Sequence, residues 1–98
     1  MSLWRWVEIP VRPESLDEAR KLLSQQAAKV RAFPGCRSVV LYEGEGPILC
    51  SFSEWESAAD LESYRQSMVF REFWEKLRPH FREKPRAVSV RKLPLPFE

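Results

Sequence analysis

The chain has 98 residues, the size of one domain with a single core. Apolar residues make up 44% of it, too many for a disordered chain, and the net charge of +2 comes from interspersed basic and acidic residues. No basic stripe interleaved with aromatic residues emerges, so nucleic acid is not an expected partner. Residues 1–9 lack the apolar core of a signal peptide, and no apolar run approaches the ~20 residues of a membrane span. We therefore expect a cytoplasmic protein with no membrane partner.

Residues 3–9 alternate between two faces, which predicts a strand. Trp4 and Trp6 share one face, which suggests that this face is covered. Arg5 lies on the opposite, otherwise apolar face. We expect it to meet a polar partner there or to lie at an edge.

A helix is expected to follow, because apolar residues recur at helical spacing from Leu16 to Val30. Residues 15–18 (Ser-Leu-Asp-Glu) have the pattern of a capping box, in which the Ser15 hydroxyl accepts a hydrogen bond from the amide three residues on. The helix should end near Ala32, because Pro34 disfavours helical geometry at the preceding residue.

Two β-favouring segments, residues 36–43 and 48–55, predict a hairpin around the loop at residues 44–47. In that hairpin Cys36 and Cys50 are about five positions apart, or ~16 Å along the strands. A disulfide cannot span this distance, so both thiols are expected to be reduced.

The next segment combines a strand end with an aromatic-rich helical region. On the strand face that carries Trp55, side chains are small near the middle and large at the end. Ser57, with Asp60 three residues on, predicts the start of a helix. Ser67 interrupts the helical pattern, which is compatible with two helices, 57–66 and 68–78.

A fourth strand over residues 86–93 and a tail over residues 94–98 complete the chain. The tail is expected to lie across a surface through Leu95 and Phe97. The order βαββαβ predicts an α+β, ferredoxin-like fold in one domain, residues 1–98, with a four-stranded antiparallel sheet and both helices on one face. The other sheet face is left open and apolar, which predicts a homodimer formed sheet against sheet.

Residues 33–36 (Phe-Pro-Gly-Cys), 53–57 (Ser-Glu-Trp-Glu-Ser) and 67–73 (Ser-Met-Val-Phe-Arg-Glu-Phe) together resemble the antibiotic biosynthesis monooxygenase (ABM) domain family. The resemblance extends over about residues 3–93. It implies a dimeric α+β barrel with a pocket in each subunit between sheet and helices. Several members oxidise polycyclic phenols or anthrones with molecular oxygen and without metal, flavin or haem, so no cofactor is expected.

The haem-degrading branch of that family is less similar. It is expected to carry a Trp in place of Tyr64, a haem-ligating His in place of Trp74, and an Asn in the first strand, where residues 3–9 have none. Haem binding is therefore the least favoured interpretation.

The candidate substrate-binding residues combine rings that stack on an aromatic ligand with a cation that stabilises an enolate or phenolate. Each also has an ordinary structural interpretation, as core packing for the aromatic rings and as a solvated side chain for the arginine. The candidates are Trp55, Trp74, Phe73, Arg71 and Met68.

The candidate catalytic residues are His80 and Tyr64. The single histidine has an ordinary pKa near 6.5, suited to removing a proton from a phenol or anthrone, although a histidine at a helix end is commonly solvent-facing. Tyr64 could place a hydrogen bond on a substrate oxygen, or it could be a core residue. No His, Cys or carboxylate stands at ligand spacing from His80, so no metal site is predicted.

Two functions follow. The first is a cofactor-independent monooxygenase, an oxidoreductase acting on a small aromatic or polycyclic phenol or anthrone. The second is a non-catalytic dimeric module that binds a small molecule, favoured by the lack of an obvious acid–base pair. An open cavity reaching a titratable side chain favours the enzyme, and a closed core around Trp55 and Trp74 favours the binding module.

Overall fold

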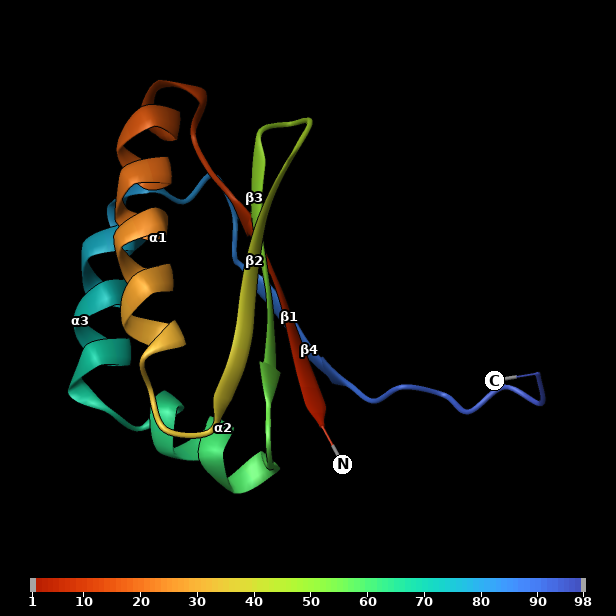
Figure 1. The fold of residues 1–98 in the computed structure, drawn as a ribbon. Coiled ribbons are helices and arrows are strands. Elements are labelled where there is room, and N and C mark those ends of the chain that lie inside the picture. The colour runs from red at the N-terminus through yellow and green to blue at the C-terminus, as the bar shows by residue number, and fades with distance from the viewer. Residues whose placement is uncertain (1, 98) are drawn as a thin grey trace.

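The computed structural model describes residues 2–97, in which one antiparallel sheet carries its α-helices on a single face (Figure 1). The strands lie in the order β2-β3-β1-β4. This is the α+β, ferredoxin-like βαββαβ fold that the sequence predicts. The elements are β1 (Leu3–Pro10), the 3-10 helix η1 (Pro13–Ser15), α1 (Leu16–Arg31), β2 (Cys36–Gly44), β3 (Ile48–Trp55), α2 (Ala58–Arg65), α3 (Met68–Leu77), the 3-10 helix η2 (Arg78–His80) and β4 (Arg86–Val90).

The helical region after β3 is divided at Ser67 into α2 and α3, as predicted. The Ser67 hydroxyl accepts a hydrogen bond from the Phe70 amide at 3.2 Å and donates one to the Tyr64 carbonyl at 2.6 Å. Ser57 caps α2 by accepting from the Asp60 amide at 3.1 Å. Each cap satisfies an amide that has no partner within its own helix.

The capping box predicted at residues 15–18 is wrong. Ser15 ends η1 with a helical backbone (φ −98°, ψ −1°), and its side chain makes no capping bond. An N-cap side chain needs an extended backbone to reach the first amides of its helix, and the 3-10 turn removes that conformation. The Ser15 hydroxyl lies instead 2.9 Å from Nδ1 of His80, which ties the start of α1 to η2.

The tight turn at residues 33–36 depends on Gly35. Its φ of 87° lies in the left-handed region, and a Cβ built there would lie 2.3 Å from the Asp60 side chain. The Gly35 carbonyl also accepts a hydrogen bond from the Glu56 amide at 2.8 Å. The turn therefore packs directly on the start of α2.

Cys36 and Cys50 are both buried and free, which confirms the expected absence of a disulfide. Across the β2–β3 ladder Cys36 pairs with Trp55 and Cys50 pairs with Tyr42, and the register shifts between Cys36 and Ser38. Burial raises the pKa of both thiols, so neither is activated toward nucleophilic chemistry.

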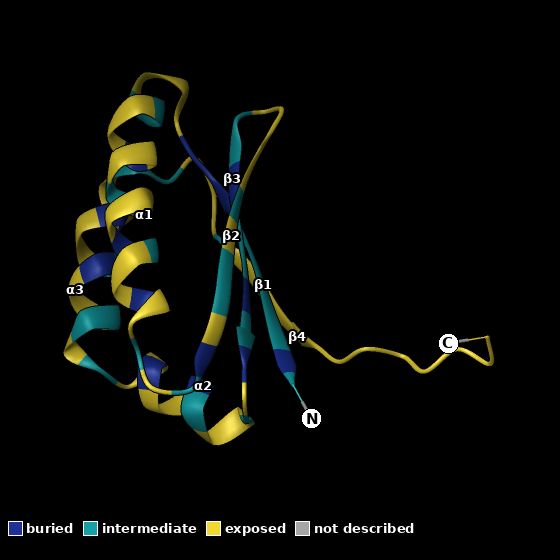
Figure 2. Ribbon diagram, in the orientation of Figure 1, coloured by how far each residue is buried: buried dark blue, intermediate teal, exposed yellow. Residues whose placement is uncertain are grey.

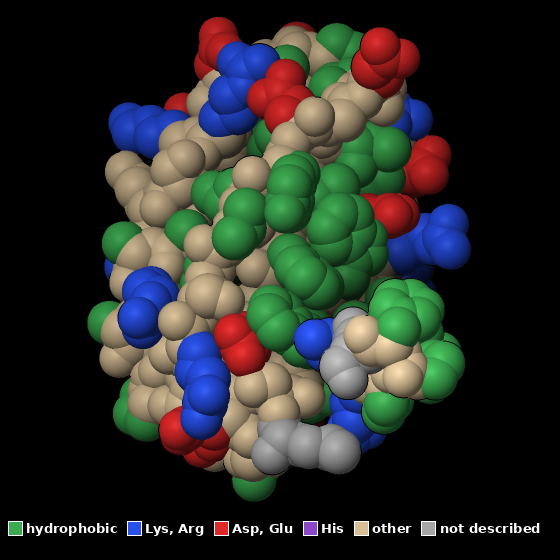
Figure 3. Space-filling view, turned by 45° about the vertical axis from the view of Figure 1, so that its right-hand side comes forward, with side chains coloured by type: hydrophobic (Ala, Val, Ile, Leu, Met, Phe, Trp, Pro, Cys, Tyr) green, Lys and Arg blue, Asp and Glu red, His purple; other side chains and the backbone are tan. Residues whose placement is uncertain are grey.

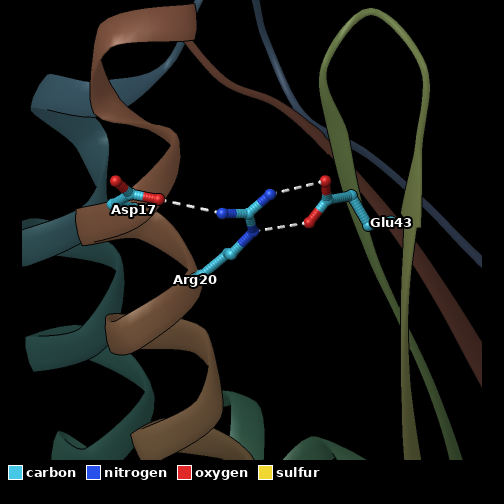
Figure 4. A network of polar contacts seen from close by, with 3 residues as sticks. All are labelled: Asp17, Arg20 and Glu43. Carbon is cyan, nitrogen blue, oxygen red and sulfur yellow. Dashed lines mark hydrogen bonds and ion pairs between the residues drawn. The ribbon is translucent and has the colours of Figure 1, made fainter.

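A surface ion-pair network joins α1 to β2 (Figure 4). Both carboxylate oxygens of Glu43 accept hydrogen bonds from the Arg20 guanidinium, at 2.6 and 2.8 Å, and Asp17 accepts a third at 2.8 Å. The hydrogen bonds from Arg20 lower the pKa of Glu43. The network holds the exposed end of the hairpin against the helix layer.

The last strand is shorter than predicted, since β4 ends at Val90 rather than at Leu93. Val90 pairs with Trp4, and β1 begins one residue before Trp4, so the ladder has no partner strand beyond this point. The chain then leaves the body (Figures 1 and 2), and Phe97, which is 83% exposed, does not pack on a surface as expected. Residue 98, the end of the predicted tail, lies outside the described residues.

The sheet face opposite the helices carries a continuous apolar surface (Figure 3). Trp4 stacks on Phe52 with ring centroids 5.1 Å apart, and Trp6 contacts both Phe52 and Tyr42. We call these rings and the flanking valines the open face; the exposed members include Val40, Tyr42, Val88 and Val90.

Within residues 2–97, none of the helices has the length and apolarity needed to cross a membrane.

Candidate functional site

A cavity of about 130 Å³ lies between the sheet and the helix layer. It opens where two buried clusters meet, one around Leu77 and the other around Trp55, and residues of both clusters line it. Most of its walls are apolar, while Arg65 and Ala87 are its exposed residues and mark the side that faces solvent. The lining residues are Arg5, Val7, Ile9, Leu23, Gln26, Ala27, Val30, Val39, Leu41, Ser51, Ser53, Leu61, Tyr64, Arg65, Phe70, Phe73, Trp74 and Ala87.

The cavity exists because β3 carries two small side chains on its helix-facing side. Ser51 and Ser53 lie between the large residues Leu49 and Trp55. Alternate strand residues share a face, so these serines form the floor beneath the helices. The row through Ser53 continues across the ladder pairs to Arg5 on β1, which places a charged side chain beside the hollow.

Tyr64 projects into the cavity from α2 and is held by a buried hydrogen bond. Gln26 on α1 donates from Nε2 to the Tyr64 hydroxyl oxygen at 2.8 Å, and both residues are buried. Burial raises the pKa of the Tyr64 phenol, and the bond from Gln26 lowers it by less. The phenol is therefore neutral near pH 7, and its own proton is available to a ligand oxygen.

Two arginines bring positive charge to the cavity. Arg5 Nη1 donates to the Ser89 hydroxyl at 3.0 Å, and no described carboxylate lies within ion-pair distance of it. Arg65 pairs with Glu62 at 3.1 Å. Partial burial lowers the pKa of the Arg5 guanidinium, the nearby charge of Arg65 lowers it further, and Glu62 offsets part of this.

The structure separates the predicted substrate-binding residues. Phe73 and Trp74 line the cavity from α3. Trp55 is fully buried behind Tyr64, with ring centroids 5.4 Å apart, and donates from Nε1 to the Ser53 hydroxyl at 2.9 Å. Met68 is 63% exposed, and Arg71 is exposed on α3; neither lines the cavity.

The predicted catalytic residues are also separated. Tyr64 lines the cavity, whereas His80 does not. His80 lies in η2, where its backbone carbonyl accepts from the Arg12 amide at 3.0 Å and its ring contacts Ser15. The contacts of His80 are thus those of a residue that anchors the start of α1, away from the cavity walls.

Five polar residues of the cavity lining were not among the predicted site residues: Arg5, Gln26, Ser51, Ser53 and Arg65. Two of them, Gln26 and Arg5, carried a signal in the sequence. Gln26 lies three residues after Leu23 and four before Val30, so helical spacing puts it on the apolar face of α1. Arg5 stands on the apolar side of β1, and the sequence does suggest a polar partner for it. A polar side chain on an apolar face was the available signal in both cases.

The chemistry of this site rests on its own side chains. Among residues 2–97, no group of three His, Cys, Asp or Glu side chains is arranged to hold a metal ion. The cavity offers a hydrogen-bonded phenol, a guanidinium without a carboxylate partner and aromatic walls. Such a site can bind a flat apolar molecule and place hydrogen bonds and positive charge on one of its oxygens.

Residues 5–76 match the family described as antibiotic biosynthesis monooxygenase. The chain belongs to this family. The resemblance of the three sequence segments is thereby confirmed. No curated protein matches the sequence of this chain.

Solved structures agree with the fold. Rv0793 from Mycobacterium tuberculosis superimposes with a TM-score of 0.88 at 23% identity, covering 98% of this chain and 99% of that one. A conserved protein from Methanosarcina mazei Go1 gives 0.88 at 20% identity, covering 95% and 94%. A structure described as an antibiotic biosynthesis monooxygenase gives 0.87 at 20% identity, covering 94% and 99%. At these identities the likeness shows the fold of this ABM-family chain and not its substrate.

Proposed function

We propose that this ABM-family protein is a cofactor-independent monooxygenase that oxidises a phenol- or anthrone-type aromatic in the cavity. The observation that carries the proposal is an apolar, ring-lined cavity whose lining includes the hydroxyl-bearing Tyr64 and the cationic Arg5. Hydrogen-bond donors and positive charge aimed at a developing oxyanion are worth most in a site that excludes water.

For a substrate with a CH₂ group beside its carbonyl, the steps are as follows. Loss of one C–H proton gives an enolate, whose oxygen accepts a hydrogen bond from Tyr64 and pairs with Arg5. The enolate carbon reduces O₂ and forms a C–O bond, which gives a peroxide and, after protonation, a hydroperoxide. Breaking the O–O bond with loss of the remaining C–H proton releases water and leaves a carbonyl. One oxygen atom enters the product, and the substrate supplies all four electrons.

The cavity's own part in these steps is electrostatic and steric. Its walls hold the ring, and Gln26 keeps the Tyr64 hydroxyl turned toward the ligand through the 2.8 Å bond. No histidine or carboxylate is among the lining residues, so the substrate's proton passes to solvent on the side of Arg65 and Ala87. This same observation favours the second candidate function, a binding module that holds an aromatic molecule without chemistry.

Oxygen uptake separates the two functions. Anthrones and quinols are supplied in turn to the purified protein, with ¹⁸O₂ to follow incorporation of one labelled atom into product. The monooxygenase proposal predicts uptake above buffer that falls in Tyr64→Phe and persists in Tyr42→Phe, the matched change at the chain's other tyrosine, on the open face. A rate of oxygen uptake equal to that in buffer for every substrate, together with saturable binding of a substrate, would show that the protein is a binding module instead.

We propose further that the protein is a homodimer joined through the open face. Exposed apolar patches of this kind mark protein interfaces, and the resemblance to the ABM family implies the same assembly. Light scattering should give twice the monomer mass of 11.6 kDa. Tyr42→Asp would place a charge within the apolar surface and should shift the mass toward the monomer; a wild-type protein of monomer mass at micromolar concentration would refute the proposal.

A further inference from the structure

Arg5 is the starting point, because it is a charged side chain whose surroundings do not neutralise it. It comes from the middle of β1 and faces the helices, alongside Val7. Its hydrogen-bond partner, the Ser89 hydroxyl, carries no charge. Glu62, whose charge acts on Arg5, is already engaged with Arg65 at 3.1 Å.

The charge of the cavity wall is therefore positive. Arg5 and Arg65 line it, and none of the lining residues is acidic. Partial burial and the neighbouring Arg65 both make the charged form of Arg5 less favourable, which is seen as a lowered pKa. A guanidinium does not lose its proton in proteins, so an anion is what relieves this cost.

The size of the cavity limits what that anion can be. Its volume of about 130 Å³ is close to the about 150 Å³ of an engineered protein cavity that binds benzene. Clefts that enclose drug-sized molecules are larger, at roughly 300–1,000 Å³. One six-membered ring fills the space, and a three-ring system would extend beyond it.

We propose that the cavity selects a single-ring aromatic anion, with its carboxylate, phenolate or enolate oxygen paired with Arg5 and its ring against Phe73 and Trp74. The inference rests on the proposed function for the location of the site and narrows its substrates to single-ring compounds, which leaves out the three-ring anthrones. Arg5 then acts as the residue that discriminates anion from neutral analogue.

Benzoate and benzamide test the charge, because they have nearly the same shape and differ in charge. Titration calorimetry under anaerobic conditions should show benzoate binding at least about tenfold more tightly than benzamide, the range of a charge-assisted hydrogen bond. In Arg5→Gln the benzoate affinity should fall by about tenfold or more, while Arg5→Lys recovers part of it. Arg78→Gln, at an exposed arginine outside the cavity, should leave both affinities unchanged.

Ring size is tested with 2-naphthoate and anthracene-2-carboxylate, which keep the carboxylate. Each added ring should weaken binding to the wild-type protein. Equal affinities for benzoate and benzamide, or tighter binding of the three-ring acid, would overturn the proposal. If Arg5→Gln does not fold, the comparisons of benzoate with benzamide and with the larger acids on the wild-type protein still test the proposal.

The binding measurement needs no oxygen, so its outcome is separate from that of the monooxygenase test. Selective benzoate binding without oxygen uptake from any substrate would leave this inference standing and refute the proposed reaction. Oxygen uptake with a neutral polycyclic substrate and no benzoate binding would support the proposed reaction and refute this inference.

Discussion

Replacing Ser51 with valine is expected to stabilise the protein and to impair its cavity at the same time. Ser51 lines the cavity from β3, and within the described chain its hydroxyl has no hydrogen-bond partner. The substitution exchanges that hydroxyl for two methyl groups that point into apolar space. It also places a β-branched residue in a strand, which favours the fold slightly.

The size of the effect follows from the area buried. Each CH₂ removed from water contributes about 0.8 kcal/mol, and a hydroxyl without a partner is removed, so we expect a gain of about 1 kcal/mol. For a domain of this size that corresponds to a rise in Tm of about 4–8 °C. One methyl group too many in an apolar site costs about 10- to 200-fold in affinity, so benzoate binding should weaken by at least the lower figure.

The matched control for Ser51→Val is Ser53→Val. The stability of both variants is measured by urea unfolding at a fixed protein concentration, with tryptophan fluorescence as the signal. Ser53→Val adds the same methyl groups two residues further along β3, on the same face, but it removes the acceptor of the Trp55 Nε1 hydrogen bond. A buried donor left without a partner costs about 1–3 kcal/mol, so this variant should be less stable than the wild type.

We therefore expect Ser51→Val and Ser53→Val to change the stability in opposite directions and both to weaken benzoate binding. Ser51→Val with lower stability than the wild type would show that the space above Ser51 is not available in solution. Ser51→Val with unchanged benzoate affinity would show that the ligand binds elsewhere. Either result would refute the reasoning from the cavity.

Three further outcomes are expected. Tyr64→Phe leaves the buried Gln26 amide without its 2.8 Å partner and should cost about 1–3 kcal/mol in urea unfolding; a neutral effect would mean that the bond is not formed. His80→Asn should leave benzoate affinity and any oxygen uptake unchanged, because His80 does not line the cavity, and complete loss of uptake would identify it as the base after all. Because Arg20 lowers the folded-state pKa of Glu43, the contribution of that pair is present at neutral pH and is lost as the pH falls through the folded-state pKa, on the acid side of the usual range of a glutamate. The Tm difference between wild type and Glu43→Gln should therefore shrink in acid, and a difference that persists at low pH would contradict the assignment.

Local rules predicted most of the fold. The alternation in residues 3–9, the apolar spacing of α1 and the turn residues at 44–47 each have a short-range physical cause, and the first three strands formed where expected. The break at Ser67 was also visible, since a serine can cap a helix. The predicted capping box at residues 15–18 did not form, because the 3-10 turn before α1 is set by Pro13 and by the contact with His80.

The site was harder to predict than the fold, because it depends on which side chains fill the space between layers. Trp55 and Trp74 are both large rings on inward faces, and their spacing does not reveal that one fills the core while the other lines a cavity. That difference arises from the serines of β3 and from the turn between α2 and α3. Gln26 and Arg5 carried a clearer signal, as polar residues on apolar faces.

The most direct test of the central claim is a crystal structure of the protein with 4-bromobenzoate, in which anomalous scattering locates the bromine. We expect one bromine peak within the cavity between β1 and α3, with the carboxylate in hydrogen-bond contact with Arg5 and the ring beside Trp74. Bromine bound on the open face or near His80, with the cavity free of ligand, would contradict it.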